Sequence, residues 1–374
     1  MRVLVVGVVS ALLATLLSGL SGPALAGPGA VPVNTVPPVL TGEPVYREPL
    51  RAEPGTWTSD TALAYSYQWL RDGRRIRGET DRRYRPQLRD LRSRLSVRVV
   101  ATDEAGATGT ATSEPTARVR RAELVLLERP GVSGTRRYTH RLTAGRPDWR
   151  QPRVAASYRW LRDGKPIAGA RHRRYRLTHL DVGHHVQVRV TARKEGYRTA
   201  GTTSRRGAEI GHRVPVRRTA TYRIETRGRI TASMATFRRE VAETYADPRG
   251  WRSAGVAFRR VSRGGDFSVV LAQASRVPGF SPVCSAQWSC RVGRYVIINQ
   301  LRWLHASPSW NRAGRPVREY RHMVVNHETG HWLGHGHLGC PGRGRPAPVM
   351  MQQSKGLDGC RHNPWPLPSE LWAR

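Results

Sequence analysis

Three kinds of residue are scarce in this 374-residue chain: cysteine, lysine and the acidic residues. The four cysteines all lie in the last quarter, so disulfides cannot cross-link the first three quarters. No apolar run beyond the first 26 residues is long enough to span a bilayer, which excludes an internal membrane domain. At this length the chain has room for two or three domains, each with its own core.

The charge of the chain is strongly one-sided. Lysine and arginine number 63 against 27 acidic residues, a formal net charge of +36, yet lysine occurs only at 165, 194 and 355. This arginine-for-lysine bias is typical of a GC-rich genome, and the arginines are spread over every segment without interleaved aromatic residues. We therefore expect no specific nucleic-acid binding, but a basic surface that could associate with anionic cell-wall polymers or lipid headgroups.

The first 26 residues have the pattern of a secretory signal. Arg2 precedes an apolar stretch over residues 3–17, and the segment ends in Ala-Leu-Ala at 24–26. Glycine and proline interrupt the end of the apolar run, which favours a cleaved signal over a membrane anchor. We expect cleavage after Ala26 and a protein that is secreted or associated with the cell wall, without a transmembrane span.

An even number of cysteines in an exported chain predicts disulfides. The candidates are Cys284, Cys290, Cys340 and Cys360. Three pairings are possible in principle. Proximity in the sequence favours Cys284 with Cys290 and Cys340 with Cys360.

Two segments of the chain are duplicates. The stretch YSYQWLRDGRRIRGETDRRY, which begins at Tyr65, aligns without a gap on ASYRWLRDGKPIAGARHRRY, which begins at Ala156. The matching positions lie 91 residues apart and include Trp69 and Trp160, Gly73 and Gly164, Tyr84 and Tyr175, and Asp90 and Asp181. We place the two units at residues 32–120 and 121–212.

Each unit has the pattern of a small all-β domain. Apolar and polar residues alternate, as in residues 65–69, which predicts half-buried strands, and the Asp-Gly pairs at 72–73 and 163–164 predict hairpin turns. About ninety residues of short strands with one early tryptophan predict an immunoglobulin-like sandwich. The WLRDG pattern resembles the bacterial immunoglobulin-like repeats of exported proteins, which implies spacers or weak wall-binding modules. Trp69 and Trp160 are expected in the cores rather than on a carbohydrate-binding surface.

From about residue 214 the pattern changes. Apolar residues that alternate or run together predict strands, and apolar residues at helical spacing predict two helices. The strands are expected at 221–225, 256–261, 267–272 and 295–299, and the helices at 232–245 and 317–333. Together they predict an α+β domain over residues 214–374. The strand at 295–299 is either an interior strand or an edge that pairs with an extended substrate.

The stretch HETGHWLGHGH at 327–337 contains four histidines and one glutamate. On a helix, His327 and His331 lie one turn apart on the same face, so their imidazoles can bind one metal ion. Glu328 is then placed to accept a proton from a metal-bound water. This arrangement is typical of zinc hydrolases.

A third ligand is needed to leave one coordination position open. His335 continues the spacing, but in a straight helix its Cα would lie about 12 Å from that of His327. Both imidazoles could not then bind zinc at about 2 Å. Gly334 can end the helix in the left-handed conformation, which lets the chain turn back and bring His337 to the metal. We therefore expect His335 not to be a ligand.

The residues His327, Glu328, His331, Gly334 and His337 match HExxHxxGxxH, the signature of the metzincin zinc peptidases. The resemblance implies one catalytic Zn²⁺ held by the three histidines, with Glu328 as the general base.

Metzincins also have a methionine turn beneath the zinc, in which the methionine forms an apolar floor without binding the metal. By this resemblance the turn lies in PAPVMMQQSKGLDGC, with Met350 as the expected residue and Met351 as the alternative. If Cys340 pairs with Cys360, the bridge encloses the turn and contributes about 3 kcal/mol. A tyrosine beyond the methionine, which some metzincins use near the zinc, is absent from residues 352–362.

The stretch over roughly residues 214–368, with YADPRGW, NHETGHWLGHGHLGCPG and HNPWP, also resembles an uncharacterised family of exported actinobacterial proteins that is assigned to the metzincin-like group. That family implies a zinc peptidase fold but no substrate. Because no cysteine precedes Cys284, latency through a cysteine switch is not expected. His322 lies off the metal-facing side of the helix and is expected to face a polar environment or solvent.

The sequence thus predicts a multidomain protein with two all-β immunoglobulin-like sandwiches followed by an α+β metzincin-like zinc peptidase domain. The expected activity is that of a secreted, monomeric, zinc-dependent endopeptidase that acts on a polypeptide. Two alternatives stay open: a non-enzymatic cell-wall-associated binding protein with a structural zinc, and a peptidoglycan amidase. An open coordination position beside Glu328 favours an enzyme, whereas a fourth protein ligand such as His335 would favour the binding protein.

Overall fold

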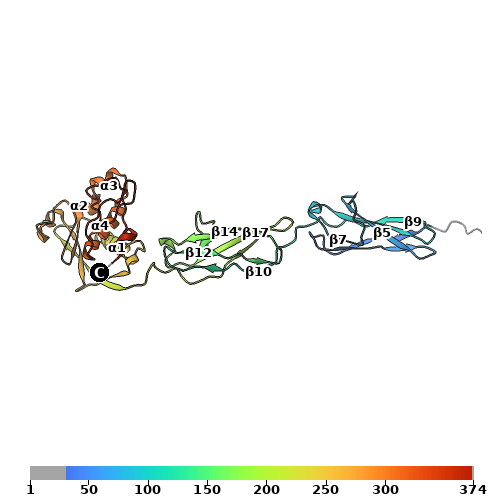
Figure 1. Ribbon diagram of the computed structural model, residues 1–374, viewed down its shortest axis with the longest axis horizontal. Helices are drawn as coiled ribbons and strands as arrows, with labels where there is room; N and C mark the ends of the chain where they lie inside the picture. The colour runs from blue at the N-terminus through green and yellow to red at the C-terminus, as the bar shows by residue number, and fades with distance from the viewer. Residues whose placement is uncertain (1–30, 373–374) are drawn as a thin grey trace, which may run out of the picture. The chain divides into compact units, whose positions relative to one another are not determined.

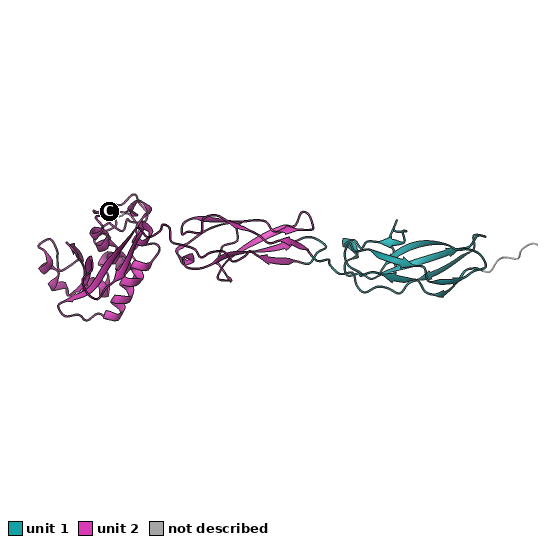
Figure 2. Cartoon of the chain, turned by 90° about the horizontal axis from the view of Figure 1, so that it is seen from below, with its two compact units in different colours: residues 1–123, 194–198 teal, residues 124–193, 199–374 magenta. Residues whose placement is uncertain are grey.

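The computed structural model describes residues 31–372, and the predicted signal peptide at 1–26 lies outside the described residues. The chain divides into two compact units, residues 1–123 with 194–198 and residues 124–193 with 199–374 (Figure 2). No helix between residues 31 and 372 combines the length and the apolar character needed to cross a membrane.

The first repeat is a sandwich of antiparallel sheets (Figure 1). Its strands are β1 (Val33–Val36), β2 (Val39–Thr41), β3 (Leu50–Glu53), β4 (Thr56–Thr58), β5 (Ala64–Arg71), β6 (Arg74–Arg75), β7 (Arg83–Tyr84), β8 (Leu95–Thr102) and β9 (Thr108–Thr112). One sheet has the order β6-β5-β8-β9, a second has the order β2-β3-β7, and β1 pairs with β4. Trp69 is fully buried in a core with Leu50 and Val97, which come from different sheets.

The second repeat has the same strand order. Its strands are β10 (Leu126–Glu128), β11 (Val132–Ser133), β12 (Arg141–Ala144), β13 (Asp148–Trp149), β14 (Ala155–Arg162), β15 (Lys165–Pro166), β16 (Arg174–Arg176), β17 (Val186–Arg193) and β18 (Ala200–Thr203). The sheets are β15-β14-β17-β18, β11-β12-β16 and β10-β13. Trp160 is fully buried with Leu142 and Val188. The predicted core positions of both tryptophans are therefore confirmed.

The predicted Asp-Gly turns are also confirmed. Asp72 and Gly73 have φ angles of 46° and 79°, and Asp163 and Gly164 have 45° and 80°. Two successive residues with positive φ are what a type I′ hairpin turn requires, and Asp-Gly tolerates this conformation better than most pairs.

Residues after 217 form one mixed five-stranded sheet with the order β20-β19-β21-β23-β22. The strands are β19 (Arg218–Arg227), β20 (Val256–Arg260), β21 (Phe267–Ala272), β22 (Cys290–Val292) and β23 (Tyr295–Asn299). Every residue of the central strand β21 is buried, as expected for a parallel strand that is covered on both faces. The four predicted strands are present, and the sequence did not reveal β22.

The helices are α1 (Met234–Ala246), α2 (Gln300–His305), α3 (Pro308–Arg312) and α4 (Val317–Trp332). Short 3₁₀ turns are η1 (Leu88–Asp90), η2 (His179–Asp181), η3 (Trp251–Ala254), η4 (Ala274–Arg276), η5 (Pro278–Phe280) and η6 (Pro368–Glu370). The predicted helices at 232–245 and 317–333 correspond to α1 and α4. Helix α4 packs against α1 and against β23, so its buried residues join the core of the sheet.

Two expectations for this region are resolved. The strand at 295–299 is interior, because β21 and β22 flank it, and the antiparallel strand β22 forms the edge. His322 does not face solvent: it is 9% exposed, and its Nδ1 lies 2.8 Å from the hydroxyl of Thr244 on α1. Of the two environments that the sequence left open for His322, the structure shows the polar one, because α1 and Trp365 cover this face of α4.

Candidate metal centre

Helix α4 positions the first two histidines of the candidate site. The helix is buried through most of its length, because Met323, Val324 and Val325 join the core while His327 and Glu328 lie in its C-terminal half. His327 and His331 are one turn apart, as the spacing predicts.

Gly334 ends the helix and redirects the chain. It has a φ of 99°, its N–H donates to the carbonyl of His331, and the N–H of His335 donates to the carbonyl of Gly330. These two bonds form a Schellman motif, which favours glycine because the left-handed conformation crowds a Cβ atom. The chain then turns back toward the helix and places His337 beside its two partners. Gly334 therefore ends the helix in the left-handed conformation, as the sequence predicts.

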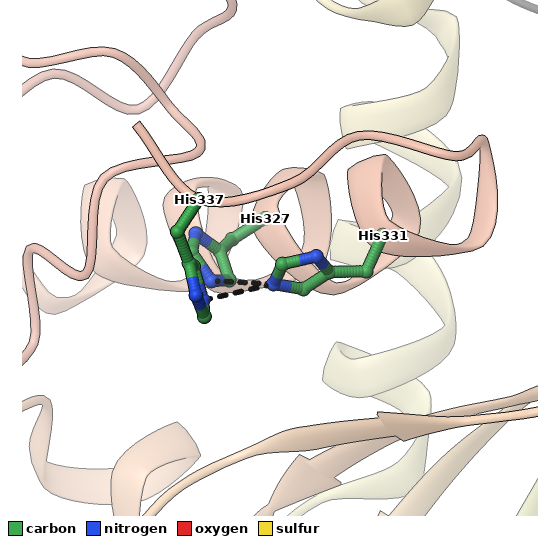
Figure 3. A group of neighbouring side chains, drawn as sticks. All are labelled: His327, His331 and His337. Carbon is green, nitrogen blue, oxygen red and sulfur yellow. Dashed lines mark hydrogen bonds between the residues drawn. The ribbon is translucent and has the colours of Figure 1, made fainter. Parts of the chain in front are cut away.

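The three histidines point their Nε2 atoms at one another (Figure 3). Nε2 of His331 lies 3.2 Å from Nε2 of His327 and 3.1 Å from Nε2 of His337. Two nitrogens that bind one zinc ion tetrahedrally at about 2 Å lie about 3.3 Å apart. The spacing therefore fits a metal ion without rearrangement of the side chains.

The tautomers of two histidines support the same conclusion. The Nδ1 of His327 donates to the carbonyl of Val349 at 2.8 Å, and the Nδ1 of His331 donates to the carbonyl of His335 at 2.8 Å. In the neutral imidazole the proton is then on Nδ1, so both Nε2 atoms carry lone pairs. Lone pairs that face one another repel, and a cation between them removes the repulsion.

Burial keeps the three histidines in the neutral form that binds metals. Desolvation lowers the pKa of His327 to about 3, and it also lowers the pKa values of His331 and His337. Neutral imidazole is the form that coordinates zinc.

Glu328 lies at the wall of the same cleft. This cleft of about 330 Å³ is lined by all three histidines, by Glu328 and by Arg291 of the edge strand β22, whose Nη2 donates to the carbonyl of His331 at 2.7 Å. Glu328 is 5% exposed, and burial raises the pKa of its carboxyl to about 8. A cation bound by the histidines would lower that pKa again and favour the carboxylate. The chain thus places a proton acceptor next to the candidate metal position.

Met350 packs against helix α4 at Gly330. A Cβ atom at Gly330 would lie 2.3 Å from the sulfur of Met350, so the absence of a side chain at Gly330 lets the methionine reach the helix. Met351 belongs to a different cluster with Ala347 and Cys360. Met351 also lines a small pocket together with His327 and Glu328, so which of the two methionines would lie beneath a metal stays a prediction.

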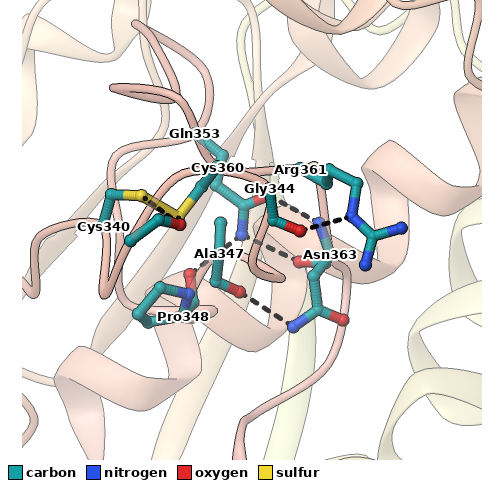
Figure 4. Close-up of a disulfide and its surroundings, with 9 residues drawn as sticks. Cys340, Gly344, Ala347, Pro348, Gln353, Cys360, Arg361 and Asn363 are labelled. Carbon is teal, nitrogen blue, oxygen red and sulfur yellow. Dashed lines mark hydrogen bonds between the residues drawn. A yellow bond between two sulfur atoms is a disulfide. The ribbon is translucent and has the colours of Figure 1, made fainter.

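Both disulfides favoured by the sequence are present, Cys284–Cys290 and Cys340–Cys360. The second closes a loop over residues 341–359, which contains Met350 and Met351; Figure 4 shows the bridge and its surroundings. Within the enclosed loop, the side-chain amide of Gln353 donates to the carbonyls of Pro348 and Asn363, and the side chain of Asn363 donates to the carbonyl of Ala347. These bonds tie the turn to the segment that follows the bridge.

The sequence did not reveal the contribution of the C-terminal segment. The carboxylate of Glu370 is 1% exposed and accepts backbone N–H bonds from Val349, Met350 and Leu367 at 3.0, 2.8 and 2.7 Å. Val349 is also the acceptor for His327, so Glu370 fixes the peptide that orients one histidine of the cluster. Nothing in the sequence around Glu370 indicates that it binds the backbone of Val349 and Met350.

His335 lies outside the cluster of three histidines but contacts one of them through its backbone. Its Nε2 lies 3.0 Å from the carbonyl of Trp372, and its ring packs between the rings of Trp251 and Trp372. Its own carbonyl accepts the Nδ1 proton of His331. His335 therefore does not join the histidine cluster, but it orients one member of it.

A family model described as "Protein of unknown function (DUF3152)" matches residues 190–363. The matched stretch contains the three clustered histidines and Glu328, and the description assigns no activity. No curated protein matches the chain.

Several solved structures are similar to the chain at low identity. "Tandem Ig repeats of Dlar" shares 14% identity, covers 46% of this chain and 96% of that chain, and has a TM-score of 0.15. An amphioxus IgVJ-C2 molecule shares 14% identity, covers 44% and 95%, and has a TM-score of 0.21. A Ca²⁺-stabilized ice-binding adhesin of an Antarctic bacterium shares 14% identity, covers 48% and 49%, and has a TM-score of 0.22. The first two are immunoglobulin-type domains, consistent with the repeats, but at these scores the assignment of the sandwiches rests on their own strand pairing.

Proposed function

We propose that the protein is a secreted zinc-dependent endopeptidase of metzincin type. The observation that carries the proposal is the convergence of three Nε2 atoms, two of them with their Nδ1 protons committed to carbonyl groups, beside a buried glutamate in an open cleft. Zn²⁺ fits this all-nitrogen donor set, and three protein ligands with an open position are typical of catalytic zinc sites.

In the proposed mechanism, His327, His331 and His337 hold the ion, which when bound would acidify a water molecule and polarise the peptide carbonyl. The carboxylate of Glu328 accepts a proton from that water as the oxygen attacks the carbonyl carbon. Glu328 then gives the proton to the amine as the C–N bond breaks, which restores the carboxylate. The orienting carbonyls of Val349 and His335 keep the two helical histidines in the required tautomer.

The position of His335 supports an enzyme over a binding protein with a structural zinc. A closed site would need a fourth protein ligand, and His335 was the leading candidate. Its Nε2 instead lies against the carbonyl of Trp372, away from the other three histidines. The cleft therefore offers room for water and substrate at the fourth position.

The edge strand β22 supports an extended substrate. It contributes Cys290 and Arg291 to the lining of the cleft, and its outer edge has no neighbouring strand among the described residues. An exposed strand edge can pair with an extended peptide through main-chain hydrogen bonds. This arrangement favours a polypeptide over a compact small molecule.

The test compares wild type with Glu328→Ala for zinc content and for cleavage of casein, a peptide library and purified peptidoglycan. We expect zinc in both proteins, and cleavage of casein and of the peptides by the wild type alone. Glu319→Gln is a matched control, because Glu319 is in the first turn of the same helix, half-buried and away from the cleft. Equal activity of wild type and Glu328→Ala would overturn the mechanism, and cleavage of peptidoglycan alone would favour the amidase.

A further inference from the structure

A cavity of about 590 Å³ in the second repeat is lined by arginine. It lies between residues 127–132, around the end of β10, and residues 204–207, which follow β18. Its arginines are Arg129, Arg136, Arg205 and Arg206. Glu128 is the one acidic residue in the lining.

These arginines differ from the structural arginines of the same repeat. Arg162 pairs with the buried carboxylate of Asp181, whereas none of the four cavity arginines forms an ion pair with a carboxylate of residues 31–372. Four positive charges around one cavity repel one another. An anionic ligand would supply the charge that the described chain does not.

One of the four side chains is held in place. Arg136 is half-buried, and its Nη1 donates to the carbonyl of Val186 at 3.3 Å. Its guanidinium lies across Gly207, where a Cβ atom would come within 2.3 Å of Nη2. The glycine therefore provides the space that the guanidinium occupies, so this part of the cavity is built around the arginine.

The first repeat provides an internal comparison for the N-terminal side of the cavity. Asn34 pairs with Trp57 in the first repeat as Leu126 pairs with Trp149 in the second. The backbone N–H of Tyr46 donates to the carbonyl of Arg120, and the N–H of Tyr138 donates in the same way to the carbonyl of Gly211, near the end of each repeat. In this register Arg129 corresponds to Pro37, and Arg136 corresponds to Pro44.

On the C-terminal side of the cavity, the first repeat also lacks the arginines of the second. The hydroxyls of Ser113 and Ser204 accept the N–H of Val97 and Val188, so these serines are equivalent. The residues that follow them are Glu114, Pro115 and Thr116 in the first repeat, and Arg205, Arg206 and Gly207 in the second. Both repeats are rich in arginine, yet only the second has arginine at these four positions. The general arginine bias of the chain therefore does not account for the cavity.

We propose that this cavity is a binding site for the phosphate groups of a flexible polyanionic polymer. Guanidinium groups bind phosphate oxygens with two parallel hydrogen bonds and stay charged at all relevant pH values. Four arginines close together can bind several phosphate groups at once. A polymer that carries a phosphate on each monomer unit therefore matches them better than a single anion does. The lining holds no aromatic side chain on which a nucleic-acid base could stack. The site would anchor the protein to an anionic matrix independently of the histidine cluster.

The test measures the affinity of the full secreted chain for inorganic polyphosphate by calorimetry at several salt concentrations. The variant replaces Arg129, Arg136, Arg205 and Arg206 with glutamine. We expect its affinity to fall at least tenfold, and the slope of log affinity against log salt to fall by about 3, because each lost phosphate contact removes about 0.7 to 0.9. The control replaces four exposed arginines of the same repeat with glutamine, namely Arg171, Arg174, Arg189 and Arg193.

Both variants lose the same charge, so only a localised site separates them. An equal loss of affinity in the two variants would overturn the proposal in favour of diffuse attraction. Tighter binding of polyglutamate than of polyphosphate would assign the cavity to carboxylates, and tighter binding of anionic phospholipid vesicles would assign it to a membrane surface; either result overturns the phosphate-polymer proposal. Preference for single-stranded DNA over polyphosphate of equal charge would do the same.

Discussion

The repeats bury aspartates that accept several hydrogen bonds, whereas Glu328, a buried carboxylate of the C-terminal domain, accepts none from residues 31–372. In the first repeat, Asp90 is fully buried and accepts hydrogen bonds from Arg71, Tyr84 and the backbone of Gln87 at 2.6 Å each. In the second repeat, Asp181 has the same set of donors: Arg162, Tyr175 and Thr178. Each aspartate joins two strands, β5 and β7 or β14 and β16, to the 3₁₀ segment that contains it.

Glu328 of the C-terminal domain is nearly as buried, but it lacks such partners. Burial is the largest influence on its pKa, Arg291 acts only at longer range, and no hydrogen bond from residues 31–372 reaches its carboxylate. A buried carboxylate with saturated hydrogen bonding stabilises a fold, whereas one left free at a cleft can exchange a proton. The comparison distinguishes the hydrogen-bonded carboxylates of Asp90 and Asp181 from the carboxylate of Glu328, which we propose accepts a proton.

The largest expected effect comes from Glu328→Gln. The amide keeps the shape of the side chain but cannot accept a proton, so we expect peptide hydrolysis to fall about 10³-fold. The midpoint of thermal unfolding should not fall, because no hydrogen bond is lost. Cleavage assays and calorimetry on the same preparation check both statements. A stability loss like that expected for Asp181 would place Glu328 among the structural carboxylates.

Asp181→Ala should have the opposite effect. It leaves the guanidinium of Arg162 without its partner and removes four hydrogen bonds, so we expect a loss of about 3 kcal/mol in the stability of the second repeat. Peptide hydrolysis at a temperature where the variant is folded should be unchanged. Chemical unfolding measures the loss, with Asp148→Ala, an exposed aspartate of the same repeat, as the control. Reduced hydrolysis by the folded variant would contradict the structural role of Asp181.

Glu370→Gln tests a carboxylate with an intermediate role. An amide cannot accept all three backbone N–H bonds, so the peptide of Val349 that orients His327 should loosen. We expect zinc affinity to fall about 10- to 100-fold, as for other groups that orient metal ligands. Competition with a chelator measures the affinity, and the absorption of the Co²⁺ form reports the ligand geometry. An unchanged affinity and spectrum with lower thermal stability would make Glu370 structural only.

The smallest expected effect concerns pH and the metal-free protein. Burial lowers the pKa of His327 from its ordinary value of 6.5 to about 3, so below pH 6.5 the unfolded chain binds a proton that the folded chain does not. Stability should therefore fall as the pH drops from 6.5 toward 3, by about 1 kcal/mol at pH 5.5 from this residue alone. Unfolding midpoints of the Glu328→Gln variant in chelator at pH 7.5 and 5.5 measure the change, because the pKa of Glu328, which burial raises to about 8, would oppose the effect in the wild type. Zinc-loaded protein should change less, because the metal competes with the proton, and an equal change in both forms would contradict the expected neutral histidines.

Much of the fold was predictable from local pattern. Alternating residues around Trp69 and Trp160 predicted the sandwiches, and the Asp-Gly pairs predicted their turns, because period-two burial and positive φ leave direct traces in sequence. Helix α4 was predictable because apolar residues at helical spacing also leave a direct trace in sequence. Strand β22 was not, since its three residues include Cys290 and Arg291 and are defined by pairing with β23. The sequence could not decide between a polar environment and solvent for His322, because its burial depends on which distant segment covers the helix.

The sequence by itself determined the membership of the histidine cluster. The spacing of His327 and His331, and a glycine at 334 able to adopt positive φ, depend on helix geometry and on the absence of a Cβ atom, and both are local properties. The tertiary structure alone decided how the cluster is oriented and what surrounds it. Val349 and Trp372 accept hydrogen bonds from His327 and His335 through backbone carbonyls, which every residue has, so no side-chain pattern predicts them. Glu370 acts through the backbone N–H of Val349, a contact that only the fold creates. The same holds for the arginine cavity, whose two sides lie about seventy positions apart and meet only when the second sandwich folds.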